Sequence, residues 1–193
     1  MFKRVQVSHE QNYIISLVYK FYGDAMKEIL SYDKLKELFE EANERFLENN
    51  KVLIERNLSE RCLCANLGYE LRDVFKEYNS VYVDVEYNRY GFEVKEIPPV
   101  LHNDSRKIIC DLIIHDRGSN NYLALEMKKI PTDDRKIKKD KNRLVFLTKD
   151  ENFQYVIGIF YEIIISVSDY KVNISYYKDG CFVESSSYLY QFD

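Results

Sequence analysis

Two β-rich segments of the chain each carry an acidic residue that antiparallel pairing would bring together. The segments span residues 108–115 and 122–129, and the six residues between them are dense in turn formers, which predicts a β-hairpin. A turn centred on the middle of this loop places Asp111 opposite Glu126. Opposed side chains of an antiparallel pair have Cβ atoms about 5 Å apart and point to one face of the sheet. The register therefore predicts two facing carboxylates.

Facing carboxylates among apolar neighbours repel one another unless a cation lies beside them. Lys128, two residues beyond Glu126, shares their face and supplies one positive charge, as in a buried ion pair of a purely structural protein. A hard divalent cation such as Mg²⁺ is the alternative, because it takes carboxylate and carbonyl oxygens and leaves positions for a phosphate oxygen. The carbonyl of Met127 would face such a site. The residues alone leave both interpretations open.

His115 lies at the tip of this hairpin, where the same register pairs it with Tyr122. Four residues of strand, at about 3.3 Å each, separate it from Asp111 by roughly 13 Å. That distance is too long for a general base acting beside the carboxylates. We expect His115 to make a hydrogen bond that stabilises the turn.

The spacing of apolar residues divides the chain into a helical part and a mixed part. Amphipathic helices are predicted between Gln11 and Asn49, and another from Ser59 to about Tyr78. The segments that follow are predicted to be a strand at 81–85, a loop at 98–105, the hairpin, a polar connection at 131–139, a helix at 140–147, a strand at 155–166 and a second hairpin at 171–177 and 181–185.

This order of elements predicts an α+β (α/β-like) protein with a mixed central sheet flanked by helices. Residues 1–56 would form an N-terminal helical extension and residues 57–193 the α/β core, packed together as a single domain.

The composition is that of an ordinary globular protein. Of 193 residues, 46% are hydrophobic and 31% charged, which excludes disorder as the main state. No apolar run approaches the roughly 18 residues of a membrane span, so we expect no membrane partner and a cytoplasmic location. Four scattered cysteines suit neither a disulfide scaffold nor a zinc site. Motifs of hydrolase triads, P-loops and dinucleotide-binding sites are absent from the sequence.

Charge is sorted along the chain, although the formal net charge is −4. Residues 128–143 include eight basic and three acidic side chains, whereas residues 24–60 include ten acidic and six basic ones. A basic run by itself is typical of a solvated helix face. Next to a catalytic site it would favour contact with a phosphate backbone.

The spacing of Asp111 and the tripeptide Glu126-Met127-Lys128 resembles the core motif of the PD-(D/E)XK nuclease superfamily, an aspartate followed by Glu-x-Lys. Over residues 59 to 165 the chain also resembles a group of small bacterial nuclease-like proteins of unknown function. The segments that carry this second likeness are 85–89, 111–118, 121–129 and 140–144. One departure is Cys110, which stands where the superfamily has a proline.

The resemblance implies a restriction-endonuclease-like core that hydrolyses phosphodiester bonds with a metal ion. It gives catalytic roles to Asp111, Glu126 and Lys128, of which Lys128 would orient the attacking water and help to deprotonate it. Mg²⁺ or Mn²⁺ would be held by Asp111, Glu126 and the Met127 carbonyl. Glu60, in the place of the superfamily's helix glutamate, would complete the metal site.

The resemblance also implies a nucleic-acid partner, DNA in preference to RNA. The residues expected to contact it are Lys129, Lys141, Arg143 and Arg89. One metal ligand and one nucleic-acid contact have alternatives. Glu70 lies on the same predicted helix as the expected ligand Glu60, and Arg89 could form an ion pair with Glu86 instead of contacting nucleic acid.

Two other functions remain compatible with the sequence. The first is a non-catalytic descendant of the nuclease fold that acts as a nucleic-acid-binding or protein-interaction module, with its acidic N-terminal helices as a docking surface. The second is a structural α+β protein in which the acidic and basic residues form a buried ion pair. The sequence leaves open whether the protein forms a homodimer, because no interface can be read from it.

Overall fold

The computed structural model describes residues 30–86, 89–90, 93–94, 109–118 and 120–192. The predicted loop at 98–105, the predicted helices before residue 30 and the side chain of Arg89 lie outside this part of the chain. The described helices are α2 (Tyr32–Asn49), α3 (Lys51–Glu55), α4 (Glu60–Val74) and α5 (Asp134–Lys149). The described strands are β1 (Tyr82–Val85), β2 (Arg89–Tyr90), β3 (Glu93–Val94), β4 (Leu112–His115), β5 (Asn121–Ile130), β6 (Ile157–Ile165), β7 (Asp169–Lys178) and β8 (Cys181–Gln191).

Six strands form one mixed sheet in the order β1-β4-β5-β6-β7-β8, and β2 pairs with β3 separately. All neighbours in the large sheet are antiparallel except β5 and β6, which are parallel. Parallel neighbours need a crossover connection, and α5 supplies it between β5 and β6. The predicted α+β class with a mixed sheet flanked by helices is confirmed.

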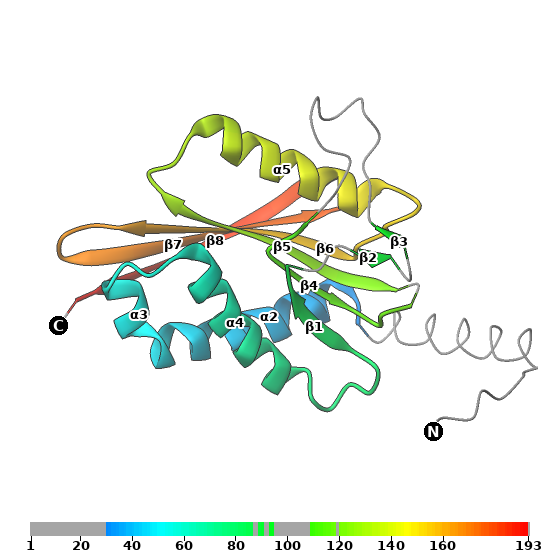
Figure 1. Ribbon diagram of the computed structural model, residues 1–193, viewed down its shortest axis with the longest axis horizontal. Coiled ribbons are helices and arrows are strands. Elements are labelled where there is room, and N and C mark those ends of the chain that lie inside the picture. Colours follow the sequence, from blue (N-terminus) through cyan, green and yellow to red (C-terminus); the bar gives the residue numbers. More distant parts are fainter. Residues whose placement is uncertain (1–29, 87–88, 91–92, 95–108, 119, 193) are drawn as a thin grey trace, which may run out of the picture.

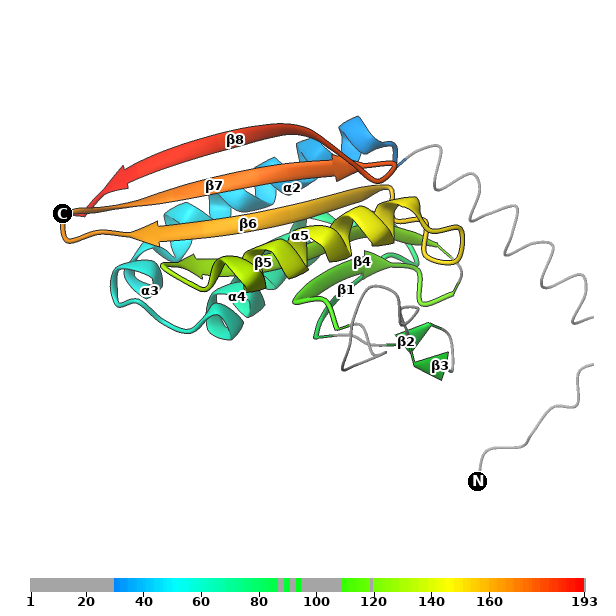
Figure 2. The same ribbon diagram turned by 90° about the horizontal axis from the view of Figure 1, so that it is seen from above.

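The sheet separates two helical layers (Figures 1 and 2). Helices α2, α3 and α4 cover one face, and α5 covers the other. Side chains of a strand alternate between the two faces, so Leu125 and Met127 join the core under α2 and α4, whereas Ala124 joins the core under α5. Glu126 and Lys128 have the same parity as Ala124 and point to the α5 side.

The predicted helix start at Ser59 is confirmed. Ser59 is the N-cap of α4, and its hydroxyl accepts a hydrogen bond from the backbone N–H of Cys62 at 3.3 Å. The helix ends at Val74, before the predicted end near Tyr78, because the next residues continue only as turns. This start places Glu60 in the first turn of α4, next to the end of β5.

The predicted polar connection over 131–139 is wrong, because α5 begins at Asp134 and not at Asp140. Asp133 caps the helix by accepting a hydrogen bond from the N–H of Arg135 at 2.8 Å. The first two turns are mostly exposed and basic, so they lack the apolar spacing from which a helix is predicted.

The predicted hairpin register is confirmed over Leu112 to Ile114, where Ile113 pairs with Ala124. It shifts at the tip, so His115 pairs with Asn121 and not with Tyr122. His115 Nε2 lies 3.0 Å from Asp84 Oδ2 of β1, so this contact joins β4 to its neighbouring strand β1.

Among the residues that the structure describes, no helix is both long and apolar enough to cross a membrane.

Helix α2 contributes to the same apolar core as α4 and the sheet. Phe39 of α2 is fully buried and makes edge contacts with Tyr161 and Tyr176, with ring centroids 6.3 Å apart in both pairs. We expect Phe39→Ala to lower the free energy of unfolding by about 3–5 kcal/mol in urea denaturation, because it leaves a cavity. Tyr69→Ala, at a residue 68% exposed, is the control and should change it by less than about 0.5 kcal/mol. If Phe39→Ala changed the free energy of unfolding as little as the control does, α2 would not be part of the cooperative unit.

Candidate functional site

The candidate site lies where β5 continues past the beginning of its neighbour β4. The last registered pair joins Leu112 to Leu125, so within the described chain no β4 residue pairs with the end of β5. Two backbone N–H groups of this open edge are taken by carboxylates instead. Asp111 Oδ2 accepts from Met127 N at 2.8 Å, and Glu60 Oε1 accepts from Lys129 N at 2.9 Å. Buried amides need such partners, so the edge brings two acids together.

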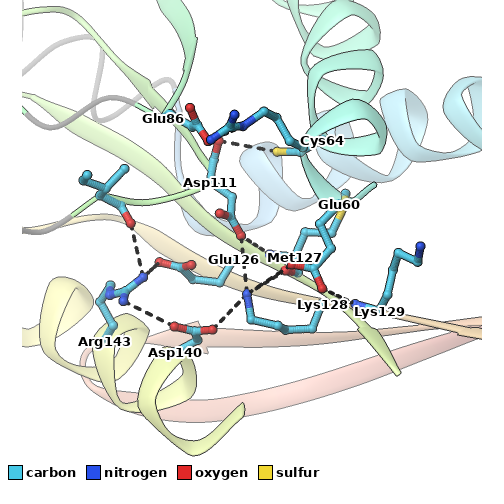
Figure 3. A network of polar contacts seen from close by, with 12 residues as sticks. Glu60, Cys64, Glu86, Asp111, Glu126, Met127, Lys128, Lys129, Asp140 and Arg143 are labelled. Carbon is cyan, nitrogen blue, oxygen red and sulfur yellow. Dashed lines mark hydrogen bonds and ion pairs between the residues drawn. The ribbon is translucent and has the colours of Figure 1, made fainter. Parts of the chain in front are cut away.

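Lys128 lies at the centre of the site, with four oxygen atoms around its Nζ (Figure 3). The distances are 3.0 Å to the Met127 carbonyl and 3.1 Å to Asp140 Oδ2. They are 3.6 Å to Glu60 Oε2 and 4.0 Å to Asp111 Oδ2. The side chain of Lys128 is only 14% exposed. One cation therefore occupies an oxygen-lined position between α4, β5 and α5.

Glu126 is turned away from that position toward Arg143 of α5. Its Oε1 lies 2.5 Å from Arg143 Nη1, and the side chain of Glu126 is 1% exposed. Arg143 also lies 3.3 Å from Asp140 Oδ1 and donates to the backbone carbonyl of Ile109 at 3.2 Å. Asp140 thus contacts both cations of the site, and Arg143 makes its contacts with groups of the protein itself.

The electrostatics of the site reflect an excess of acid. Burial, together with the charges of Asp111 and Asp140, raises the pKa of Glu126 to about 8, although Arg143 opposes the shift. Burial also raises the pKa of Asp111, against the hydrogen bond from Met127 N and the charge of Lys128. The pKa of Lys128 is raised because Asp140 and Asp111 outweigh burial, which lowers it. Lys128 is therefore protonated near neutral pH.

These residues match the chemistry of a hard divalent cation in part. Carboxylate and carbonyl oxygens are the ligands that Mg²⁺ and Mn²⁺ prefer, and the four carboxyl groups of the site outnumber the two cations that they contact, Lys128 and Arg143. In the described residues, however, no three acidic, histidine or cysteine side chains form a group that could hold a metal ion. The oxygens surround the Lys128 ammonium instead, so a metal ion would have to displace it.

A cleft of about 650 Å³ adjoins the acidic side of the site. Glu60 and Asp111 line it, together with Arg61 at its rim, where Arg61 Nε lies 2.7 Å from Glu86 Oε1. The other residues that line the cleft are Ser59, Cys64, Val85, Lys129, Pro131 and Thr132. The site is thus accessible to a ligand from one side.

The predicted nucleic-acid contacts that fall in the described chain make contacts within the protein. Lys129 Nζ donates to the carbonyls of Asn57 and Leu58 at 2.9 and 2.8 Å. Lys141 Nζ lies 4.6 Å from the centre of the Phe160 ring and 3.8 Å from Glu162 Oε1. Arg143 is paired as described. Their roles in binding stay predictions.

The exposed basic residues of the region lie instead on the outer face of α5. They are Arg135, Lys136, Lys138 and Lys139. The sequence shows that basic residues are concentrated here. Their outward orientation follows from α5, which begins at Asp134 and not at the predicted Asp140.

The structure brings Glu60, and not Glu70, into the site. Glu70 is buried farther along α4, where it accepts a hydrogen bond from Asn49 Nδ2 at 3.1 Å. Asp140 belongs to the site, although no role for it is predicted from the sequence. Its i,i+3 spacing from Arg143 on one helix face was the available signal.

Comparison with models of known protein families and with curated protein sequences found no match to this chain.

The raised pKa of Glu126 predicts how stability depends on pH. The folded protein keeps a proton on Glu126 up to about pH 8, whereas the unfolded chain releases it near its ordinary pKa of 4.5. Between these values the unfolding free energy contributed by Glu126 falls as pH rises. We expect Glu126→Gln to gain stability relative to wild type, on the order of a few kcal/mol, between pH 5 and pH 8 in urea denaturation.

Glu151→Gln, at an exposed turn residue, is the control and should follow wild type at each pH. A difference between Glu126→Gln and wild type that stays constant from pH 5 to pH 8 would show that Glu126 is ionised in the folded protein throughout.

Proposed function

We propose that this protein is a metal-dependent nuclease with a restriction-endonuclease-like core of the PD-(D/E)XK type. The observation that carries the proposal is the set of four oxygens around Lys128 Nζ beside an open cleft. Three come from the residues of the motif and its helix glutamate: Asp111, Met127 and Glu60. A cationic position lined by these oxygens at the side of a cleft suits phosphate chemistry.

In this proposal Mg²⁺ or Mn²⁺ would be held by Asp111, Glu60 and the Met127 carbonyl, with Glu126 available once it leaves Arg143. The ion would act as a Lewis acid toward a phosphate oxygen. Lys128 would then orient the attacking water as a hydrogen-bond donor. Its raised pKa favours that role over the removal of a proton from water.

The fold supports the proposal in two ways. Asp111 directly precedes β4, Glu126 lies on the antiparallel neighbour β5, and the crossover through α5 sets a second helix against the site. Helix α5, which carries the exposed basic face, begins two residues after Thr132 of the cleft wall, so a bound phosphate backbone could follow it. DNA is the proposed substrate, and the cytoplasm the proposed location.

One observation favours a second candidate, the non-catalytic descendant that binds nucleic acid or protein. Glu126 is buried and paired with Arg143, and a buried acid with a fixed cationic partner does not need a metal ion. The two candidates differ in whether a divalent cation binds and whether phosphodiester bonds are cut.

The first prediction that separates them concerns the melting temperature. If a divalent cation binds the folded protein alone, Mn²⁺ at about 100 times its Kd stabilises it by about 2.7 kcal/mol, or roughly 5–10 °C. We expect Glu60→Gln to reduce this shift by more than half in a thermal denaturation series with Mn²⁺ and with chelator. Glu70→Gln, on the same helix, is the matched control and should keep the full shift. No shift in wild type would contradict metal binding.

The second prediction concerns cleavage of labelled single-stranded, double-stranded and branched DNA and of RNA. With Mg²⁺ or Mn²⁺ we expect wild type to cut DNA, and Asp111→Asn and Lys128→Ala to lower the rate by about 100-fold or more, because each removes a charged group at the reacting phosphate. Lys171→Ala, at an exposed residue of β7, should cut like wild type. Retained binding without metal-dependent cutting would favour the non-catalytic module.

A further inference from the structure

Asp140 is the acidic residue that contacts both cations of the site. It is 6% exposed and lies on the buried face of α5. Its Oδ2 lies 3.1 Å from Lys128 Nζ, and its Oδ1 lies 3.3 Å from Arg143 Nη2. Both carboxylate oxygens are therefore engaged, each with a different cation (Figure 3).

The acceptors of Lys128 come from two sides of the sheet edge. Glu60 belongs to α4 on one face, and Asp140 belongs to α5 on the other. Of the three carboxylates within 4.0 Å of Lys128 Nζ, Asp140 is the nearest. It also lies apart from the cleft, whose lining includes Glu60 and Asp111 but not Asp140.

This placement has a consequence for a cation that enters from the cleft. Such an ion would compete with the ammonium for Glu60, Asp111 and the Met127 carbonyl. Asp140 would be the acceptor left to Lys128, since it does not line the cleft. A lysine with no remaining partner would move into solvent, because its four-carbon chain is flexible and its charge is strongly hydrated.

We propose that Asp140 is a positioning residue: it retains the Lys128 ammonium beside the cleft when a divalent cation takes the other oxygens. This inference rests on the proposed function, because it assigns a task to Lys128 in the metal-bound state. Through Arg143, Asp140 also fixes the cation that pairs with Glu126. One side chain thus sets the positions of both cations.

The first test needs neither metal nor substrate. An amine-acylating reagent modifies lysines according to their exposure and pairing, and mass spectrometry measures the rate at each residue. We expect Asp140→Asn to raise the acylation rate of Lys128 at least fivefold at fixed pH. Asp134→Asn, an exposed aspartate of the same helix, is the matched control and should leave the rate unchanged. Equal rates in both variants would overturn the inference.

The second test asks whether Asp140 acts on the metal site through Lys128. When Asp140→Asn is made in the wild-type background, the Lys128 ammonium is left to compete with Mn²⁺ for the remaining oxygens. The Mn²⁺ concentration that gives half of the thermal shift should therefore rise at least threefold. In a Lys128→Met background the same substitution should change it by less than half as much on the logarithmic scale. Equal changes in both backgrounds would show that Asp140 acts on the ion directly, which overturns the proposal.

A third test uses only the wild-type chain, so it holds even if Asp140→Asn does not fold. With saturating Mn²⁺, Lys128 should remain as protected from acylation as it is in chelator, because Asp140 retains it. A rise of fivefold or more on Mn²⁺ binding would overturn the proposal.

Kinetics separate a positioning role from a structural one. We expect Asp140→Asn to lower kcat at least tenfold with KM for DNA within twofold of wild type, and Asp134→Asn to change neither. A rise in KM with unchanged kcat would contradict positioning. If wild type binds no metal and cuts nothing, the proposed function fails, whereas the metal-free acylation test still decides whether Asp140 holds Lys128.

Discussion

The site depends on one constraint, the unequal lengths of β4 and β5 at the point where β4 begins. Past Leu112 the end of β5 has no strand on that side within the described chain, and its amides still need acceptors. Asp111 and Glu60 supply them through Met127 N and Lys129 N. If β4 paired with β5 along its whole length, backbone carbonyls of β4 would accept from these amides, and acidic side chains from the two helical layers would not meet there. The open edge instead lets acidic side chains from different elements meet beside a cleft.

Charge balance follows from this geometry. Gathering four carboxylates in a partly buried place raises the pKa of Glu126 and Asp111, and two cations are held among them. Breaking a buried pair by removing one partner costs about 3–5 kcal/mol, whereas exposed pairs contribute about 0–1 kcal/mol. The contacts of Asp140 with Lys128 and Arg143 therefore matter far more to local order than the exposed ion pairs of the surface. The negative charge that remains is what a divalent cation would offset.

The sequence allowed the centre of the site to be predicted, because strand alternation and turn position are local. Glu126 and Lys128 share a face by period two, and the position of the turn predicts the register from Leu112 to Ile114, whereas Asp111 precedes β4 and has no registered partner within the described chain. The start of α5 was missed because its first turns are solvated and carry no apolar period. The choice of Glu60 over Glu70 depends on how α4 packs, and the partners of Arg143 depend on how α5 crosses the sheet. Such contacts between distant segments leave no periodic signal in the chain.

Glu126 is the residue at which the two candidate functions differ most. A buried ion pair contributes little net stability compared with well-packed apolar side chains, so the fold alone does not account for acids and bases placed together here. With Arg143 as a permanent partner, Glu126 would complete a closed polar network that serves a binding module. With Arg143 as a temporary partner, Asp140 can keep the guanidinium in place while Glu126 turns toward the position that the Lys128 ammonium now occupies. The second arrangement uses every charged group of the site, including the link through Asp140, and for that reason we favour the nuclease.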